Sequence, residues 1–414
     1  MTRGLGAAGG RTSRRKLLRV AGSGAALAVL GAGAAGCRQD DQPKGGGKEP
    51  SSAASSGSGS GSGSGGSDGR APKPLWSKPS ATQINSQDGG LLATAGVVLA
   101  AGEPLTARDA KTGAERWSLA EGTTAGARLL LGGGTLFLAS GKFDGSIGGL
   151  DPATGKETWR SRLGPDFDQP RPIAADDKQV YVTAAILKKG LMTRTNVIAA
   201  LNARTGKLVW REKRDTGTEE NGINAVVQGN RLVYTDIRKN LTVRDTATGR
   251  QVWTHKTGKT NYGSFAVHQD LVIVAQGASL QAFRLSDGGR KWSVKAKDFD
   301  TFKAPSVLDG ILYVADSGRN LWAMDPSNGR THWRRDDLAN ANRTAPIQFV
   351  KVKDTLYGGT ELDDRGGVHA FDVKTGALRW TFNDNSGDFH EWLVATDGTH
   401  VFAHHGKKLH ALPA

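Results

Sequence analysis

Short runs of apolar residues recur along residues 74–414, and turn-forming Gly, Asp, Asn and Thr separate them. Val180–Val182, Leu232–Tyr234, Leu271–Val274 and Leu312–Val314 are four such runs. Runs this short and this apolar suit the strands of sheets that are covered on both faces. No segment has the spacing of a long amphipathic helix, in which apolar positions recur every three or four residues. The pattern therefore predicts an all-β protein.

One sequence motif, which we call the phrase, recurs between these runs, and residues 149–159 (GLDPATGKETW) are its clearest copy. Asp or Asn is followed four residues later by Gly and eight residues later by Trp. An acid that can accept bonds from nearby amides, followed by a Gly that tolerates positive φ, predicts a tight turn between two strands. The seven copies are Asp109/Gly113/Trp117, Asp151/Gly155/Trp159, Asn202/Gly206/Trp210, Asp245/Gly249/Trp253, Arg284/Gly288/Trp292, Asp325/Gly329/Trp333 and Asp372/Gly376/Trp380.

The spacing of the phrases indicates the architecture. Successive tryptophans lie 42, 51, 43, 39, 41 and 47 residues apart. A period near forty with several short strands per repeat is typical of a β-propeller with one blade per repeat. A linear array of independent β-domains is the alternative, but forty residues bury too little surface to form a core alone.

The two ends of this region complete each other. Pro74–Ser77 resembles the last strand of a repeat and ends near Trp76, whereas three strands are expected at Glu391–Asp397, Val401–His405 and Leu409–Leu412. We therefore predict that the N-terminal strand closes the last of eight four-stranded antiparallel blades. A seven-bladed ring with Trp76 as a packed leader is the alternative.

Two repeats are longer than the others. In the third, strands are expected at 171–176, 179–186, 196–202 and 208–211, and the extra length falls near Leu187–Thr195; in the seventh it falls near Glu361–Gly367. Both segments are expected to be loops on one rim and candidate binding surfaces.

The first 36 residues have the features of an export signal. Ser13–Arg19 is basic and contains the pair Arg14 and Arg15, and an uncharged stretch, Val20–Gly36, follows. Ser-Arg-Arg-x-Leu-Leu resembles the twin-arginine export motif. Ala34–Cys37 resembles a bacterial lipobox, which would make Cys37 the lipidated N-terminus after cleavage, although Ala34 stands where Leu is preferred. A signal-anchor helix is the alternative, but the stretch is short for a membrane span.

The composition predicts a disordered tether and does not favour a nucleic-acid partner. Residues 37–73 are rich in Ser and Gly and are expected to be a disordered tether that joins the lipid anchor to a propeller at 74–414. The formal net charge is +15, but residues 1–36 hold six basic residues and no acid. The other basic residues have no interleaved aromatic platform, so a nucleic-acid partner is not expected. Cys37 is the only cysteine, which excludes an internal disulfide.

The seven phrases resemble the tryptophan-docking repeat of quinoprotein-type, or PQQ-like, β-propellers. The resemblance covers residues 74–414 and implies that each Trp packs on the neighbouring blade: Trp76, Trp117, Trp159, Trp210, Trp253, Trp292, Trp333 and Trp380. Arg284 departs from the acid position, so a looser turn is expected in that repeat.

Two branches of this family imply different functions. Quinoprotein dehydrogenases use pyrroloquinoline quinone with calcium and usually carry an adjacent cysteine pair, which this sequence lacks. Lipid-anchored scaffolds of the BamB type bind other proteins. We expect a non-catalytic, monomeric scaffold on the extracytoplasmic face of the cell membrane, which binds an envelope or membrane protein through its rim loops and has no catalytic residue, cofactor or metal. A quinoprotein dehydrogenase and an extracytoplasmic ligand sensor are the alternatives.

Two other groups of polar residues are candidates for metal binding. Six histidines fall late in the chain, and Asn383–Asp388 resembles a calcium loop. His404 and His405 are adjacent on a strand and so face opposite sides, and the loop lacks the Glu at its twelfth position that a calcium loop needs. Surface or packing histidines and a simple turn are therefore expected. The six are His369, His390, His400, His404, His405 and His410.

Overall fold

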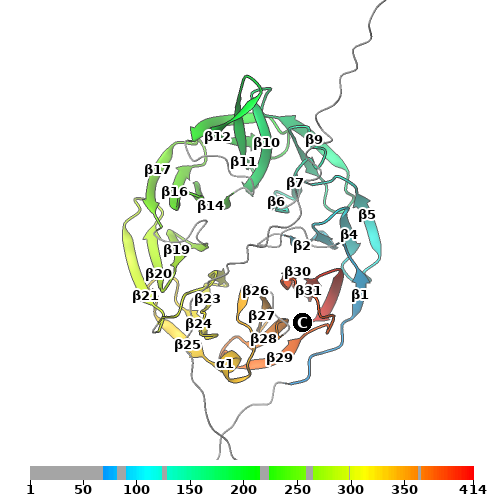
Figure 1. The fold of residues 1–414 in the computed structure, drawn as a ribbon, viewed down its shortest axis with the longest axis vertical. Helices are drawn as coiled ribbons and strands as arrows, with labels where there is room; N and C mark the ends of the chain where they lie inside the picture. Colours follow the sequence, from blue (N-terminus) through cyan, green and yellow to red (C-terminus); the bar gives the residue numbers. More distant parts are fainter. Residues whose placement is uncertain are drawn as a thin grey trace, which may run out of the picture. The chain divides into compact units, whose positions relative to one another are not determined.

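The computed structural model describes residues 69–81, 90–123, 128–214, 223–257, 264–297, 299–361 and 365–414. The predicted export residues Arg14 and Arg15 and the predicted lipidation site Cys37 lie outside these ranges. The described part forms eight four-stranded antiparallel sheets arranged as blades around a ring (Figure 1). The predicted eight-bladed β-propeller is confirmed.

Blades one to seven run in chain order from the innermost to the outermost strand. Blade one has β2 (Leu91–Thr94), β3 (Val97–Ala100), β4 (Leu105–Asp109) and β5 (Glu115–Leu119); blade two has β6 (Leu130–Gly132), β7 (Thr135–Ala139), β8 (Ser146–Leu150) and β9 (Glu157–Arg162); blade three has β10 (Phe167–Ala175), β11 (Gln179–Lys188), β12 (Leu191–Asn202) and β13 (Leu208–Arg214); blade four has β14 (Asn224–Gln228), β15 (Arg231–Thr235), β16 (Asn240–Asp245) and β17 (Gln251–Lys256).

The second half of the ring repeats this order. Blade five has β18 (Phe265–His268), β19 (Leu271–Gln276), β20 (Ser279–Arg284) and β21 (Arg290–Lys295); blade six has β22 (Ser306–Leu308), β23 (Ile311–Ala315), β24 (Leu321–Met324) and β25 (Thr331–Arg335); blade seven has β26 (Pro346–Val352), β27 (Thr355–Thr360), β28 (Val368–Asp372) and β29 (Leu378–Phe382); blade eight has β30 (Leu393–Thr396), β31 (His400–His405), β32 (Lys408–Pro413) and, from the other end of the chain, β1 (Trp76–Pro79).

Blade eight closes the ring with both ends of this region. β1 pairs antiparallel with β32, with Trp76 opposite Ala411 and Pro79 opposite Lys408. The predicted closure by an N-terminal strand is therefore confirmed, and the seven-bladed alternative with Trp76 as a leader was wrong.

The hydrophobic core lies between blades rather than within them. Eight clusters of buried residues each combine side chains from two neighbouring blades, so that every one of the eight interfaces has its own core. The cluster between blades eight and one, for example, joins Trp76 and Phe402 to Val98. Residues 65–414 form one compact unit, which holds all eight cores and both halves of the closing blade.

Helix is almost absent from the described residues. The one α-helix there, α1, is a single turn at Asp337–Asn340 in the connection between blades six and seven. None of the described helical structure has the length and apolarity that a membrane-spanning helix needs.

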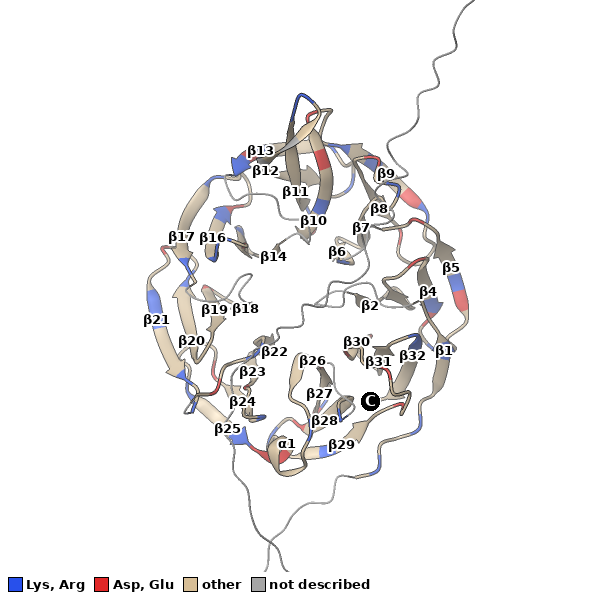
Figure 2. Ribbon diagram, in the orientation of Figure 1, with Lys and Arg blue, Asp and Glu red and all other residues tan. Residues whose placement is uncertain are grey.

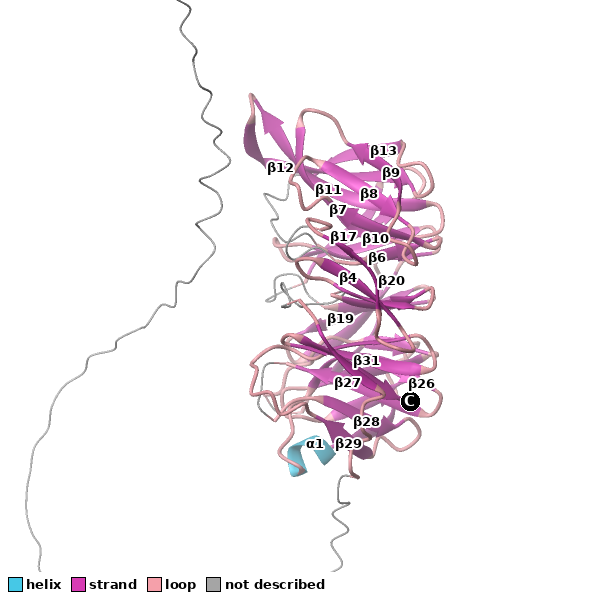
Figure 3. Ribbon diagram, turned by 90° about the vertical axis from the view of Figure 1, so that its right-hand side faces the viewer, coloured by secondary structure: helices cyan, strands magenta, loops and turns pink. Residues whose placement is uncertain are grey.

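The strand order puts two kinds of connection on opposite rims (Figure 3). We call one rim the connection rim: it carries the segments that join consecutive blades and the turns between the second and third strands of each blade. The other rim, the phrase rim, carries the Asp/Asn–Gly turns and the turns between the first and second strands. In Figure 3 the connection rim is on the left, where α1 and the end of β12 project.

The phrase rim links each blade to the next through its tryptophan. Seven indole Nε1 groups donate to the carbonyl of the residue after the phrase's first position, as Trp159 does to Ala203 at 2.9 Å. Each ring also lies on the phrase glycine of the next blade, which has φ between 66° and 75°. Trp117, for example, lies on Gly155.

The fifth phrase has the same turn as the others despite Arg284. Gly288 N donates to Arg284 O at 2.9 Å and Arg284 N donates to Gly289 O at 2.9 Å, as in the acid-containing copies. The guanidinium pairs with Asp287 at 2.7 Å, and Asp287 accepts a bond from Gly289 N. The looser turn expected here is therefore not observed, because Asp287 supplies the carboxylate from another position.

Trp380 is the exception among the eight. The next blade has no phrase between β32 and β1, and among the described residues no carbonyl accepts a bond from its Nε1. Gly69 instead bridges to Trp380, with Gly69 N donating to Arg379 O at 2.7 Å. A cavity of about 440 Å³ remains there, with Arg70, Pro72, Trp380 and Ala414 among its lining residues.

Candidate functional site

Exposed apolar side chains mark the connection rim. Ten large hydrophobic residues of the described chain are exposed, and five of these lie on this rim. The others lie on outer strands, beside β1 or in the channel, and none of them lies in an Asp/Asn–Gly turn or in a described turn between first and second strands. Isolated exposed hydrophobics are normal, but their concentration in the turns and connections of one rim indicates a binding surface. The five are Phe143, Leu191, Ile237, Phe299 and Phe389.

Phe299 is held outward by a hydrogen-bonded loop. It follows β21 and has 98% of its surface exposed, whereas Phe302, three residues later, is buried edge-on against Trp322. The loop is fixed to the turn of blade six, since Thr301 N donates to Ser317 Oγ at 2.9 Å and Ser317 N donates to Thr301 O at 2.9 Å. A fixed loop thus presents a fully exposed aromatic ring, as interface anchors do.

The connection from blade seven to blade eight repeats this arrangement. Phe389 is 70% exposed, and Trp392, three residues later, is fully buried. Trp392 stacks on His405 with ring centroids 4.1 Å apart and an angle of 10° between the planes. In both connections a buried aromatic residue therefore anchors the chain while an exposed phenylalanine projects from it.

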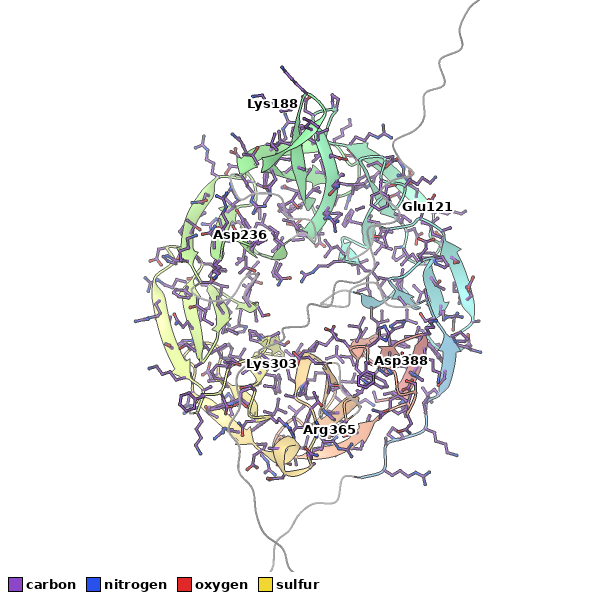
Figure 4. All side chains as sticks on the ribbon, in the orientation of Figure 1. Glu121, Lys188, Asp236, Lys303, Arg365 and Asp388 are labelled. Atoms are coloured by element: carbon purple, nitrogen blue, oxygen red, sulfur yellow. The ribbon has the colours of Figure 1, made fainter. Side chains whose placement is uncertain are left out.

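The first predicted rim loop is a β-hairpin. Residues 187–195 lie mostly within β11 and β12, and Lys188 pairs with Leu191 across a two-residue turn. Lys189 and Gly190 have φ of 51° and 75°, which fits the type I′ turn that matches strand twist. The prediction of a loop was wrong, because the two strands continue to pair beyond the blade after one register shift between Ala185 and Leu187. Figure 4 labels Lys188 where the hairpin projects from the ring.

The second predicted rim loop joins β27 to β28, and residues 362–364 of it lie outside the described ranges. Its first residue, Glu361, pairs at 2.7 Å with Lys303, which lies in the connection between blades five and six. At its end, Arg365 donates to Asn342 Oδ1 at 3.1 Å. Both ends of this segment are therefore tied to the connections around blade six, in the half of the ring where Figure 4 labels Lys303 and Arg365.

The histidines of blade eight surround one buried carboxylate. Asp384, which follows β29, lies 3.2 Å from His405 Nδ1 and 3.5 Å from His410 Nε2, and all three side chains are nearly inaccessible. Burial raises the pKa of Asp384, but hydrogen bonds from Ser386 and His405 outweigh this and hold it below its usual range. Burial lowers the pKa of His410, and the Asp384 charge opposes that shift.

Two further histidines are packing residues. His369 contacts Thr381 Oγ1 and Thr344 O, both at 2.9 Å, and burial lowers its pKa to about 4. His404 contacts Ser80 Oγ at 3.0 Å, and burial again lowers the pKa to about 4. His390 and His400 lie nearer the surface beside Asp388 and Asp397.

The predicted turn at Asn383–Asp388 consists of local side-chain-to-backbone bonds. Asn385 N donates to Asn383 Oδ1 at 2.7 Å, and Ser386 N donates to Asp384 Oδ1 at 3.1 Å. These bonds direct the Asp384 carboxylate inward toward the histidines. Within the described ranges, no three His, Cys, Asp or Glu side chains converge in a way that could hold a metal ion.

The central channel is the place where this fold could hold a quinone. A cavity of about 180 Å³ lies against the inner strands of blades four to seven, and Arg128 crosses from blade two to donate to Asn224 Oδ1. A planar quinone carboxylate with Ca²⁺ needs cations and several carboxylate ligands. The described lining offers one cation and no carboxylate, so these residues do not fit that group. The lining residues are Arg128, Asn224, Ala225, Val226, Ser264, Phe265, Ala304, Pro305, Ser306, Ile347 and Gln348.

Eight four-stranded blades, linked by a tryptophan on a glycine turn, define a PQQ-like β-propeller of the quinoprotein type. The family model described as outer membrane protein assembly factor BamB matches residues 67–165, 143–213, 194–301 and 296–386. The chain belongs to this family.

Individual relatives are distant. The BamB of Alkalilimnicola ehrlichii is 28% identical over 134 residues, which are 30% of this chain and 34% of that protein. The BamB of Shewanella oneidensis is 22% identical over 315 residues, which are 62% of this chain and 78% of that protein. The match thus spans about a third of the first relative and most of the second.

Solved structures share the fold. BamB from Moraxella catarrhalis superposes with a TM-score of 0.57 at 15% identity, covering 82% of this chain and all of that one. A quinohemoprotein alcohol dehydrogenase from Pseudomonas putida HK5 gives 0.55 at 13% identity, covering 82% and 76%. At these identities the likeness is one of fold alone.

The sequence did not single out four of the five exposed rim residues. Phe143, Ile237, Phe299 and Phe389 are single apolar residues in polar connections, and they differ from packing residues only by their surroundings. For Phe299 a signal existed, since it stands between Asp298 and Asp300.

Proposed function

We propose that this protein is a non-catalytic scaffold that binds a protein of the cell envelope through the connection rim. The observation that carries the proposal is the concentration of exposed hydrophobics in the turns and connections of that rim, with Phe299 and Phe389 presented by anchored loops. Interfaces rely on a few such aromatic anchors surrounded by polar residues. Membership of the BamB family supports an envelope role.

The proposal includes export and membrane attachment. The sequence of residues 1–37, with Arg14, Arg15 and Cys37, supports a lipid-anchored protein on the extracytoplasmic face of the membrane. The Ser/Gly-rich residues up to 73 give the propeller reach from such an anchor.

A quinoprotein dehydrogenase is the competing function. The described channel lining does not favour it, because one arginine and no carboxylate face the cavity. Adding the quinone with calcium and following dye reduction tests this alternative: substrate-dependent reduction would contradict a non-catalytic scaffold.

Affinity capture tests the scaffold. The tagged mature protein is crosslinked in cells, purified from membranes, and its partners are identified by mass spectrometry. We expect one reproducible envelope protein, which is lost from the double variant Phe299→Asp/Phe389→Asp and retained by Leu208→Asp/Val252→Asp, a control pair of exposed residues on the outer strands. Equal capture by both double variants would contradict binding through the connection rim.

A further inference from the structure

The turns between the second and third strands of blades two, three and four share a chemical feature. Each presents one exposed apolar side chain beside at least one exposed basic side chain on the connection rim, and Lys239 adds a half-buried one in blade four. Figure 2 shows the basic tip of the β11–β12 hairpin in blue. We call these residues the basic arc: Lys142, Phe143, Lys188, Lys189, Leu191, Ile237, Arg238 and Lys239.

The turn of blade four does not require its apolar residue. Asn240 N donates to Asp236 Oδ1 at 3.0 Å, and Lys239 N donates to Asp236 O at 3.0 Å. Blade six builds the same turn, in which Asn320 N donates to Asp316 Oδ1 at 2.9 Å. There the tip is Ser317-Gly318 where blade four has Ile237-Arg238. The exposed Ile237 is therefore not explained by the turn that carries it.

Phe143 is likewise placed outward by the fold around it. Its φ of 53° is unfavourable for a bulky residue. The neighbouring Asp144 holds the turn, since it accepts bonds from Ser146 N at 3.0 Å and Ser146 Oγ at 2.6 Å. The chain thus adopts an unfavourable backbone conformation in a turn that leaves 69% of the phenylalanine in solvent.

The two acids within these turns, Asp144 and Asp236, are held by other partners. Asp144 accepts bonds from Ser146 and pairs with Arg162 at 3.3 Å, and Asp236 is buried within its own turn. The exposed phenylalanines elsewhere on this rim differ, because Asp300 follows Phe299 and Asp388 precedes Phe389. Basic residues also stand in the corresponding turns of blade six (Arg319) and blade eight (Lys407 and Lys408), but those turns carry no exposed apolar side chain.

We propose that the basic arc docks on an anionic lipid surface. Apolar side chains on separate projecting tips, each beside lysine or arginine, can enter the headgroup region while the cations contact anionic lipids. A protein partner would more readily match one contiguous apolar patch. The hairpin tip, with Lys188, Lys189 and Leu191, is the leading contact because it extends farthest from its blade. This proposal does not depend on the partner binding proposed above.

Vesicle binding tests the proposal with residues 65–414, which contain all eight interblade cores. Phosphatidylcholine vesicles are compared with vesicles that also contain phosphatidylglycerol. We expect binding to the anionic vesicles that weakens as salt is raised. Each lysine near such a surface contributes about fivefold in partitioning, so Lys188→Gln/Lys189→Gln should weaken binding about 25-fold. Lys111→Gln/Lys156→Gln, on the phrase rim, should leave it unchanged.

A matched pair of phenylalanines tests the apolar contact. Phe143 and Phe389 are 69% and 70% exposed on the same rim, but only Phe143 belongs to the arc. Phe143→Ser should weaken vesicle binding about tenfold, whereas Phe389→Ser should not affect it. Equal effects of the two substitutions, or equal effects of the two lysine pairs, would overturn the proposal. Failure of the unsubstituted domain to bind anionic vesicles would also overturn it, and arc variants that then lose capture of an envelope protein would identify a protein surface instead.

Discussion

Trp117 of blade one lies on Gly155 of blade two, so closely that a Cβ added at Gly155 would stand 2.7 Å from the indole Cδ2. The same indole donates from Nε1 to Pro152 O at 3.0 Å. Gly155 also has a φ of 69°, so the position needs glycine for its backbone and for its neighbour. One residue thus serves both the turn within its blade and the contact between two blades.

Replacing Gly155 with alanine should destabilise the propeller by about 3 kcal/mol, because it combines left-handed backbone strain with overpacking against Trp117. The control is Gly134→Ala, at a φ of 77° with no atom near the added Cβ. The control should cost only about 1 kcal/mol. Urea unfolding of both variants measures the difference, and equal midpoints would show that the tryptophan contact contributes nothing.

Loss of the indole N–H should reduce stability less at the interface between blades seven and eight than at the other interfaces between blades. Trp159→Phe leaves the Ala203 carbonyl without its 2.9 Å donor and should cost about 1–2 kcal/mol. Trp380→Phe should cost less, because among the described residues no carbonyl accepts a bond from this indole. Thermal unfolding measures the stability loss of each variant. A larger loss for Trp380→Phe would contradict the absence of an acceptor for the Trp380 indole among the described residues.

Stability should fall between pH 6.5 and pH 4 through the buried histidines. Burial lowers the pKa of His369 to about 4 in the folded state, while the unfolded value stays near 6.5. The unfolded chain therefore binds protons more readily, and the stability present above pH 6.5 is lost as the pH falls toward 4. The loss is about 2 kcal/mol by pH 5 for one such histidine.

His369→Gln should reduce this pH dependence, although it lowers stability at pH 7 as well. The quantity to compare is the change in urea midpoint between pH 7 and pH 5 in the variant and in the unsubstituted protein. His404, whose pKa burial also lowers to about 4, should supply the dependence that remains. An unchanged pH dependence in His369→Gln would show that this side chain is not kept neutral by the fold.

Substitutions at Phe299 and Phe302 should have different effects on partner binding and on stability. Phe302→Ala removes a buried ring packed on Trp322 and should destabilise the propeller by about 3–5 kcal/mol. Phe299→Ser removes a ring in full contact with water, so stability should change by less than about 0.5 kcal/mol. Capture of the envelope partner should nevertheless fall about tenfold or more in Phe299→Ser. Loss of stability without loss of capture in that variant would contradict a binding role.

Most of the fold could be predicted from the sequence because its elements repeat. The phrase sets where each third strand ends and each fourth begins, and the isolated strand at Trp76 matched the three strands before Ala414. The hairpin of blade three was missed because its tip, Lys188–Leu191, lacks the Asp and Thr that mark the other turns. Of the two turn residues, only Gly190 is of a type that type I′ turns prefer, and Lys189 is not.

The binding surface was harder to predict, because the type of a residue does not show whether its side chain is exposed in the fold. Phe299 and Phe302 belong to the same short segment, and only the packing of Trp322 on one of them decides which faces solvent. The interface between blades seven and eight has a similar explanation. Pro72 stands four residues before Trp76, at the position where the seven phrases have glycine. The effect of this difference shows only in the fold, where Pro72 and Trp380 line the same cavity.

Site-specific photocrosslinking in cells tests whether an envelope protein binds the connection rim. A photoreactive residue is placed in turn at Phe299 and Phe389 on the connection rim and at Lys111 and Lys374 on the phrase rim. We expect adducts with one reproducible envelope protein from the first two positions and none from the other two. Adducts from the phrase-rim positions alone, or none from any position, would contradict a scaffold that binds through the connection rim.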